Sequence, residues 1–237
     1  MMETIELTVP TSWNELTKRQ LLTVASFIDM TLTREEVLFV LTCMFSGIKF
    51  IKDEGHIYEF VEEETNRHFA LKDWQMKWFC DKMKWVLDTS PVDIVSPLGI
   101  DGHLNDVSFD DYFEADALFF KHKITGDTDA YWRAVELLGY KAWPKMVSRG
   151  MRLAVDIWWT GVQGYMKQLY PNVFSGDGDA EEYNPREAYQ NIMLMLNDDR
   201  PQENEKIGKT NVHAVLAALD SKIQKAKQME EQMRKGK

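Results

Sequence analysis

The sequence predicts a mainly α-helical protein, a helical bundle-like domain with a small N-terminal antiparallel β element of two or three short strands. Most periodic segments repeat apolar residues at the three- and four-residue spacing of an amphipathic helix. A few short segments instead alternate apolar and polar residues, which is the period of a half-buried strand. Hydrophobic residues make up 44% of the 237-residue chain and aromatic residues 12%, so the chain has enough apolar surface for a sizeable core.

Three short segments near the N-terminus carry the strand pattern. Residues 5–9 alternate apolar and polar side chains up to Pro10, which predicts a short edge strand. Residues 57–61 and 68–71 flank the polar stretch 62–66, as expected for a hairpin with a five-residue loop. We therefore expect one small sheet, in which residues 5–9 are the candidate third strand.

A capping box marks the start of the first helix. Thr17 and Gln20 have the capping-box spacing ahead of an apolar stripe, while Ser12 and Glu15 offer a rival start five residues earlier. Either start gives a helix that ends near Met30.

The second helix has a similar start signal. Thr33 and Glu36 repeat the capping-box spacing, and Gly47 is placed to end the helix. The apolar residues between them recur at helical intervals and form one stripe: Val37, Val40, Leu41, Met44 and Phe45.

The segment 72–88 is unusual because a helix with about 100° per residue places its apolar residues on two stripes. One stripe contains Trp74, Trp78 and Trp85. The other contains Met76, Phe79, Met83 and Val86. A helix that is apolar on both sides is normally sandwiched in a core. The alternative is an exposed tryptophan stripe that docks a partner, because aromatic residues dominate interface hot spots, and this makes the three tryptophans candidate partner-binding residues.

The clearest break in the periodic pattern is rich in proline and glycine, and we interpret it as a linker over residues 91–107. It separates an N-terminal lobe of short strands and three helices, residues 1–90, from a C-terminal helical lobe, residues 108–226. The last residues, 227–237, concentrate lysine and form a basic tail.

The C-terminal lobe is predicted to begin with a helical hairpin. Ser108 caps an aromatic helix that runs to about Lys123. Gly126 and the two residues after it mark a turn into a second helix around residues 131–138.

Three further helices complete the predicted lobe. The longest is expected from Pro144 to Leu169, with Pro171 behind it. A shorter helix starts after Asn184. The final helix carries an apolar stripe of Val212, Val215, Leu216, Leu219 and Ile223.

Two interpretations of the residues after Ala226 stay open. They are a dispensable, solvated tail, or they continue the last helix when a partner covers Met229 and Met233, since methionine adapts to varied surfaces. We favour the second interpretation, because basic residues concentrated at one end of a chain of net charge -10 steer an acidic partner. Met229 and Met233 are therefore also candidate partner-binding residues.

The sequence contains no catalytic or metal-binding motif that we recognise. The five histidines occur singly and never at the spacing that places two imidazoles on one metal. Gly161 and Gly164 lie within a helical pattern and not in a phosphate loop. The acidic run 176–182 does not match the positions of a calcium-binding loop. We therefore expect a protein that is not an enzyme and uses no cofactor or metal.

Charge and cysteine usage limit the partners and the compartment. The 38 acidic and 28 basic residues give a net charge of -10, which repels phosphate backbones and anionic lipid surfaces. We expect a partner that is neither nucleic acid nor membrane. Cys43 and Cys80 lie in apolar segments as free thiols, which is typical of a reducing compartment. Residues 1–10 lack the pattern of a signal peptide, so we expect a cytoplasmic location.

Four segments carry a resemblance to a known class of proteins. They are VPTSWNELTKRQL at residues 9–21, VSFDDYFEADALFFKHKITGD at 107–127, YMKQLYPNVFS at 165–175 and NVHAVLAALDSKIQKAKQMEE at 211–231. Together these segments resemble phage tail-cassette proteins, in particular the tail assembly chaperones of temperate phages of gut bacteria. The match covers roughly a third of the chain and contains no catalytic motif.

The resemblance implies a protein-binding factor in phage tail morphogenesis, located in the cytoplasm of the bacterial host. Such a chaperone binds the tape-measure protein and keeps it soluble until the tube protein polymerises around it. Two alternatives stay open: a structural component of the tail or its connector, and an accessory enzyme whose active site follows no known motif.

Overall fold

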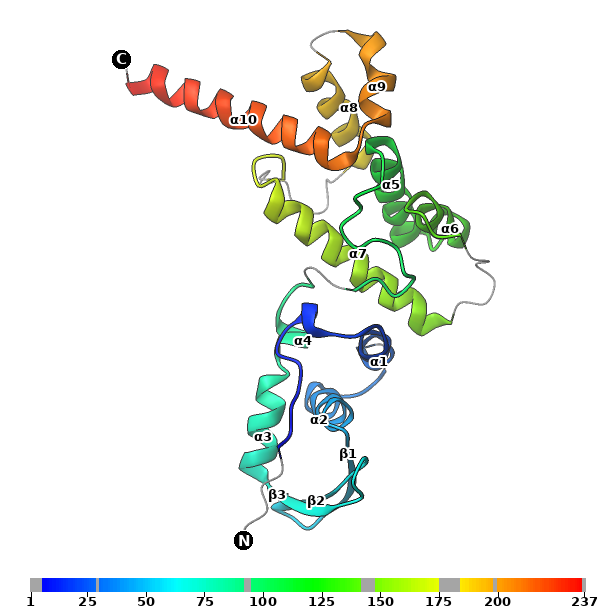
Figure 1. Cartoon of the computed structure of the whole chain (residues 1–237), viewed down its shortest axis with the longest axis vertical. Helices are drawn as coiled ribbons and strands as arrows, with labels where there is room; N and C mark the ends of the chain where they lie inside the picture. Colours follow the sequence, from blue (N-terminus) through cyan, green and yellow to red (C-terminus); the bar gives the residue numbers. More distant parts are fainter. Residues whose placement is uncertain are drawn as a thin grey trace. The chain divides into compact units, whose positions relative to one another are not determined.

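The computed structural model describes residues 6–28, 30–91, 95–141, 148–174, 184–197 and 200–235 (Figure 1). Within these ranges the chain is mainly helical, with one three-stranded antiparallel sheet near the N-terminus. This confirms the predicted fold class. The chain divides into two compact units, residues 1–97 with 147–162 and residues 98–146 with 163–237.

The first unit begins with a short turn, η1 (Trp13–Glu15), followed by helix α1 (Lys18–Ile28). The backbone N–H of Thr17 donates to Gln20 Oε1 at 2.9 Å, and the N–H of Gln20 donates to Thr17 Oγ1 at 3.3 Å. The first helix therefore uses the later of its two predicted starts.

Helix α2 (Arg34–Phe45) has the capping box that the sequence predicts at Thr33 and Glu36. Gly47 follows the helix with a φ of +66°, a left-handed conformation that glycine adopts without strain. The turn leads directly into the first strand.

The sheet contains β1 (Ile48–Asp53), β2 (Ile57–Glu62) and β3 (His68–Lys72), in that order and all antiparallel. β2 and β3 are the predicted hairpin, with Phe60 paired to Phe69, so that prediction is confirmed. β1, which follows α2 directly, was not predicted.

The predicted strand at residues 5–9 is wrong for its described part, because residues 6–9 are not in a strand, and Ile5 lies outside the described residues. Leu7 packs against the apolar cluster that contains Phe60, and Val9 packs against the cluster formed by α1 and α2. The alternation in this segment therefore reflects packing of an extended chain without strand pairing.

The segment 72–88 forms two helices, α3 (Asp73–Lys82) and α4 (Trp85–Asp88), where one helix was expected. Met83 and Lys84 form a turn between them. Met83 is fully buried in the core cluster of α1 and α2, and this places the turn against the core.

Helix α7 (Arg149–Leu169) is the predicted longest helix before Pro171, although its expected start at Pro144 lies outside the described residues. Ser148 is not helical, and its hydroxyl accepts a hydrogen bond from the N–H of Met151 at 3.2 Å. The first part of α7 belongs to the first unit, where Ala154 packs in the core cluster of α1 and α2.

The first two helices of the second unit form the predicted helical hairpin, α5 (Phe109–Thr125) and α6 (Thr128–Leu137). The Ser108 hydroxyl caps α5 as predicted, and the Asp127 carboxylate caps α6. Gly126 lies between the helices in the left-handed conformation, which allows the tight turn.

The remaining helices of the second unit are α8 (Pro185–Leu196), α9 (Asn204–Lys209) and α10 (Val212–Lys235), with the turn η3 (Pro201–Glu203) before α9. α8 begins after Asn184 as predicted. The final helix continues to Lys235, well beyond the predicted stripe. The predicted tail at 227–237 is therefore helical for its described part.

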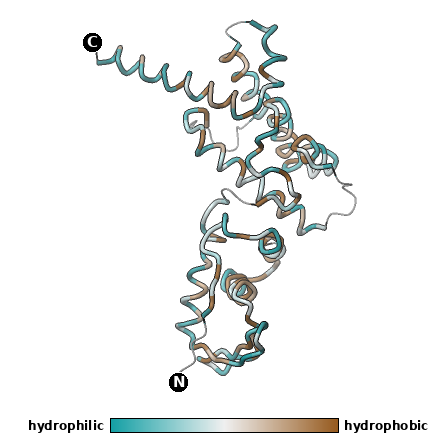
Figure 2. The backbone as a smooth tube through the Cα atoms, in the orientation of Figure 1, coloured by the Kyte–Doolittle hydropathy of each residue, from teal (hydrophilic) through white to brown (hydrophobic). Residues whose placement is uncertain are grey.

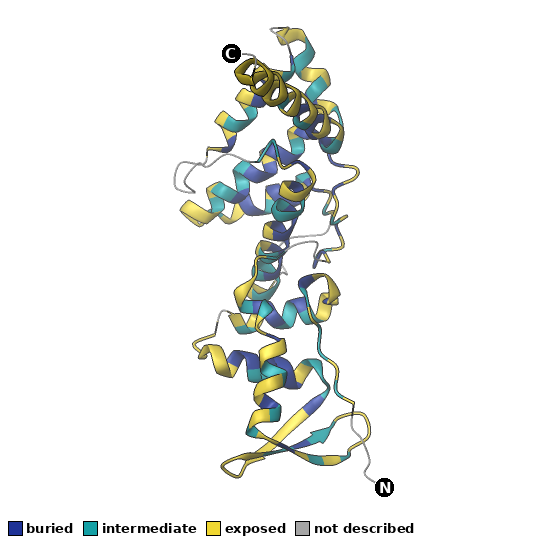
Figure 3. Ribbon diagram, turned by 90° about the vertical axis from the view of Figure 1, so that its left-hand side faces the viewer, coloured by how far each residue is buried: buried dark blue, intermediate teal, exposed yellow. Residues whose placement is uncertain are grey.

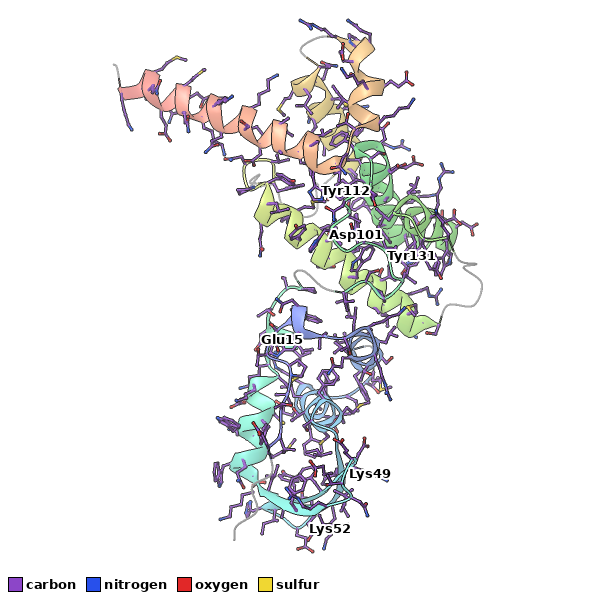
Figure 4. The ribbon with its side chains drawn as sticks, viewed as in Figure 1. Glu15, Lys49, Lys52, Asp101, Tyr112 and Tyr131 are labelled. Atoms are coloured by element: carbon purple, nitrogen blue, oxygen red, sulfur yellow. The ribbon has the colours of Figure 1, made fainter. Side chains whose placement is uncertain are left out.

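Residues 98–107, from the predicted linker, belong to the second unit and are hydrogen bonded within it. Asp101 accepts hydrogen bonds from the backbone N–H groups of His103 and Asn105, at 3.0 and 2.9 Å (Figure 4). The N–H of Val212 donates to the carbonyl of Val107 at 3.0 Å. This stretch is therefore hydrogen bonded to the start of α10 within the second unit.

Candidate protein-binding surfaces

Helix α3 presents two of the three candidate tryptophans to solvent. Trp74 is 67% exposed and Trp78 is 52% exposed. On the opposite stripe of α3, Met76 is buried, with an exposed fraction of 3%, and Phe79 is half-buried. Trp74 and Trp78 are therefore exposed, as in the interpretation of a tryptophan stripe. The opposite face of α3 packs inward, as in the interpretation of a core helix.

Trp85 lies elsewhere, because the turn at Met83 and Lys84 separates it from α3. Its ring packs edge-on against Trp13, with 5.2 Å between the centroids, and its indole N–H donates to the carbonyl of Pro10 at 3.1 Å. Trp85 is therefore held against the core cluster of α1 and α2 and does not share the surface formed by Trp74 and Trp78.

The two exposed indoles are carried by a well-anchored helix. Met76, Phe79 and Cys80 attach α3 to the apolar cluster next to the sheet. Trp78 packs edge-on against Phe79 with 5.0 Å between the ring centroids. The helix therefore fixes the positions of the rings more firmly than a loop does, which lowers the entropy cost of binding.

Basic side chains lie beside the exposed tryptophans. Lys82 Nζ lies 3.9 Å from the centre of the Trp78 ring, in a cation–π contact. Lys77 is also exposed on α3. Asp81 forms an ion pair with Lys84 at 2.7 Å, which partly neutralises its charge. We call Trp74, Lys77, Trp78 and Lys82 the α3 surface; it combines apolar rings with positive charge.

The other two candidate residues lie at the end of α10. Met229 is 59% exposed and Met233 is 68% exposed. Figure 3 shows this part of the helix as exposed, and Figure 2 shows it as mainly hydrophilic. Both methionines belong to the second unit, whereas the three candidate tryptophans belong to the first.

An exposed apolar group on the sheet was not expected from the sequence. Phe50 and Ile51, on β1, and Ile57, on β2, are each partly exposed. The alternation of Ile48 and Phe50 directly after Gly47 was the available signal. A bulge between Phe50 and Lys52 interrupts this edge strand, and Lys49 and Lys52 extend from it (Figure 4). Bulges and lysines are devices that protect a strand edge from unwanted pairing.

His56 and Asp73 form an exposed pair, with 2.7 Å between Nδ1 and Oδ2. The hydrogen bond raises the pKa of His56 and lowers the pKa of Asp73. The stabilisation linked to His56 is complete below its ordinary pKa of 6.5 and is lost as the pH rises through the raised value. The stabilisation linked to Asp73 is complete above its ordinary pKa of 3.8 and is lost as the pH falls through the lowered value.

The other described histidines for which contacts are resolved have structural contacts, and two of them are neighbours, because His213 Nε2–H donates to the backbone carbonyl of His103. His103 stacks on Tyr165 with 4.7 Å between the rings, and His213 Nδ1 lies 2.8 Å from the hydroxyl of Tyr170. The Nδ1–H of His122 donates to a backbone carbonyl at 2.9 Å. Among the residues that the structure describes, no three His, Cys, Asp or Glu side chains are placed to hold one metal ion. The acidic run 176–182 lies outside the described residues.

The two cysteines are thiols packed in the first unit. Burial raises the pKa of Cys43 to about 12, and burial also raises the pKa of Cys80. Both thiols are therefore protonated near neutral pH, which makes them poor nucleophiles.

Comparisons with known proteins add no relative. Neither protein-family models, nor curated proteins, nor solved structures give a match to this chain. Across the described ranges, no helix combines the length and the apolar character needed to cross a membrane.

Proposed function

We propose that this chain is a protein-binding factor whose α3 surface holds an amphipathic helix of a partner protein. The observation that carries the proposal is the exposure of two tryptophans, Trp74 and Trp78, on one face of an anchored helix. Tryptophan is the residue type most enriched in binding hot spots. More than half of each side chain is exposed, so a partner that covers these rings removes a large apolar area from water.

The apolar rings and positive charges of the α3 surface also indicate what kind of partner it binds. A helix with an apolar stripe fits beside a helix that displays two indole rings, as in helix-in-groove recognition. Lys77 and Lys82 favour acidic side chains flanking that stripe, because charge complementarity selects partners and speeds association.

The resemblance to tail assembly chaperones provides the candidate partner, the tape-measure protein, and the candidate location, the cytoplasm of the bacterial host. Tape-measure proteins are long and rich in helices, so an unassembled one displays many amphipathic segments that aggregate unless they are covered. In this proposal the chain acts by binding, without catalysis or a cofactor, until the tail tube forms.

The test is co-expression of the full chain with the tape-measure protein of the phage that encodes it. The readout is the soluble fraction of tape-measure protein. The double variant W74A/W78A is expected to lose most of this solubilisation, because one hot-spot truncation typically weakens binding by at least about thirtyfold. The matched control is Ile124→Ala, which removes a similarly exposed apolar side chain from α5 and is expected to behave as the wild type.

An unchanged soluble fraction with W74A/W78A would show that the α3 surface does not bind this partner. Mass spectrometry of purified virions separates the chaperone from a structural tail or connector component. A chaperone is absent from mature particles, whereas a structural component is present in stoichiometric amounts.

A further inference from the structure

The C-terminal end of α10 extends beyond its packing partners in the second unit. The buried face of the helix ends at the half-buried residue Ile223. Farther along, Lys227 Nζ donates to the Asn172 side chain at 3.1 Å. All residues from 224 to 235 are exposed. The helix thus continues for two turns past Lys227, although short helices without tertiary contacts are only marginally stable in water.

The apolar residues of this end follow a heptad pattern. Ala226, Met229 and Met233 are separated by three and then four residues, which are the a, d and a positions of a coiled coil. Lys225 then occupies the g position on one side of the stripe, and Glu230 occupies the e position on the other side.

We propose that this end of α10 pairs with the same segment of a second copy as a short, parallel, two-stranded coiled coil. In parallel pairing, the g position of one helix faces the following e position of the other. Lys225 of each copy therefore meets Glu230 of the partner subunit, and the two-fold symmetry provides the attraction twice.

The positions of Lys225 and Glu230 favour the parallel orientation of the two copies over the antiparallel one. An antiparallel pair places g against g and e against e, so Lys225 and Glu230 lose their opposite charges as partners. The seam has only three apolar positions, and interfaces below about 1,000 Å² are typically weak. The dimer is therefore a weak, concentration-dependent one. This proposal uses a different helix from the α3 surface and does not depend on the proposed function.

The first experiment is sedimentation equilibrium of the full chain from about 10 μM to about 1 mM, a range that covers weak association. The wild type is expected to change from monomer to dimer across this range. The variant M229E/M233E is expected to stay monomeric. The control Q224E/Q228E adds the same two charges on the outer face of the helix and is expected to dimerise as the wild type does.

The second experiment tests the register by charge exchange. The single variants K225E and E230K each create two like-charge contacts and are expected to weaken the dimer by about tenfold. Mixing the two variants restores both Lys–Glu pairs, so the mixture is expected to regain wild-type affinity, as is the double variant K225E/E230K.

Three results would overturn the proposal: a wild type that is monomeric at every concentration, a dimer that survives M229E/M233E, or a mixture of K225E and E230K that associates no better than either variant alone. Circular dichroism melting of each variant checks that the second unit is folded. A variant that melts early is replaced by the milder change Met229→Gln, which is expected to weaken the dimer without reaching the core.

Discussion

Replacing Met83 and, separately, Trp74 by alanine tests the assignment of the two apolar stripes of residues 72–88. Met83 is fully buried in the core of the first unit. Truncating a buried methionine removes its transfer free energy and leaves a cavity, which costs about 2–5 kcal/mol. We expect Met83→Ala to lower the free energy of unfolding by an amount in that range.

The expected loss for Trp74→Ala is much smaller. The residue is 67% exposed, so about a third of the roughly 150–250 Å² that a tryptophan can bury is removed from water. At about 25 cal/mol per Å², burial of this area contributes at most ~1–2 kcal/mol to the free energy of unfolding. Residual burial in the denatured chain reduces it further, and alanine is the better helix former by ~0.5 kcal/mol. We expect a net loss below about 1 kcal/mol.

Urea unfolding followed by circular dichroism at the helix band measures both variants without relying on tryptophan fluorescence. An equal loss of unfolding free energy for Trp74→Ala and Met83→Ala would contradict the assignment of the two stripes. That result would mean that the indole is covered in solution and that the α3 surface is not available to a partner.

Two further predictions concern close contacts. A Cβ atom on Gly208 would lie 2.2 Å from Asp110 Oδ2, and Asp110 Oδ1 accepts a hydrogen bond from the Tyr189 hydroxyl at 2.7 Å. Gly208→Ala is therefore expected to cost about 1–3 kcal/mol despite its better helix propensity; this loss, measured by thermal unfolding, should shrink when Asp110 is also alanine. His56→Gln is expected to remove the decline in stability as the pH rises past 6.5. An NMR titration in which His56 shows no raised pKa would contradict the pairing with Asp73.

The sequence was informative wherever a local interaction sets the structure. The capping box at Thr33 and the cap at Ser108 involve neighbours within three residues, so the pattern alone predicts them. The same holds for the β2–β3 hairpin, whose loop is short. The choice between Thr17 and Ser12 as the first start was not decided by the pattern, because both residues have the required spacing.

The incorrect predictions concern segments whose structure depends on packing against residues that are distant in the sequence. Residues 6–9 alternate polar and apolar side chains as a strand does. Their apolar residues, Leu7 and Val9, instead pack against two different clusters without strand pairing. The expected stripe of three tryptophans assumed a helix without interruption. Met83 is buried and lies in a turn that ends α3. Trp85 therefore does not continue the helical spacing of Trp74 and Trp78. No local signal distinguishes these outcomes, since each depends on residues far away in the sequence.

The first unit is assembled from two separate stretches of the chain, residues 1–97 and 147–162. During synthesis the ribosome must therefore produce the whole intervening stretch before α7 can contribute Ala154 to the core around α1 and α2. Domains commonly fold in the order in which they emerge, but here the N-terminal part waits for a later helix. A nascent chain released before Leu153 would lack the α7 residues that pack on this core, namely Leu153, Ala154 and Ile157. Part of the apolar surface of the core would then stay exposed to water, and such surface favours aggregation.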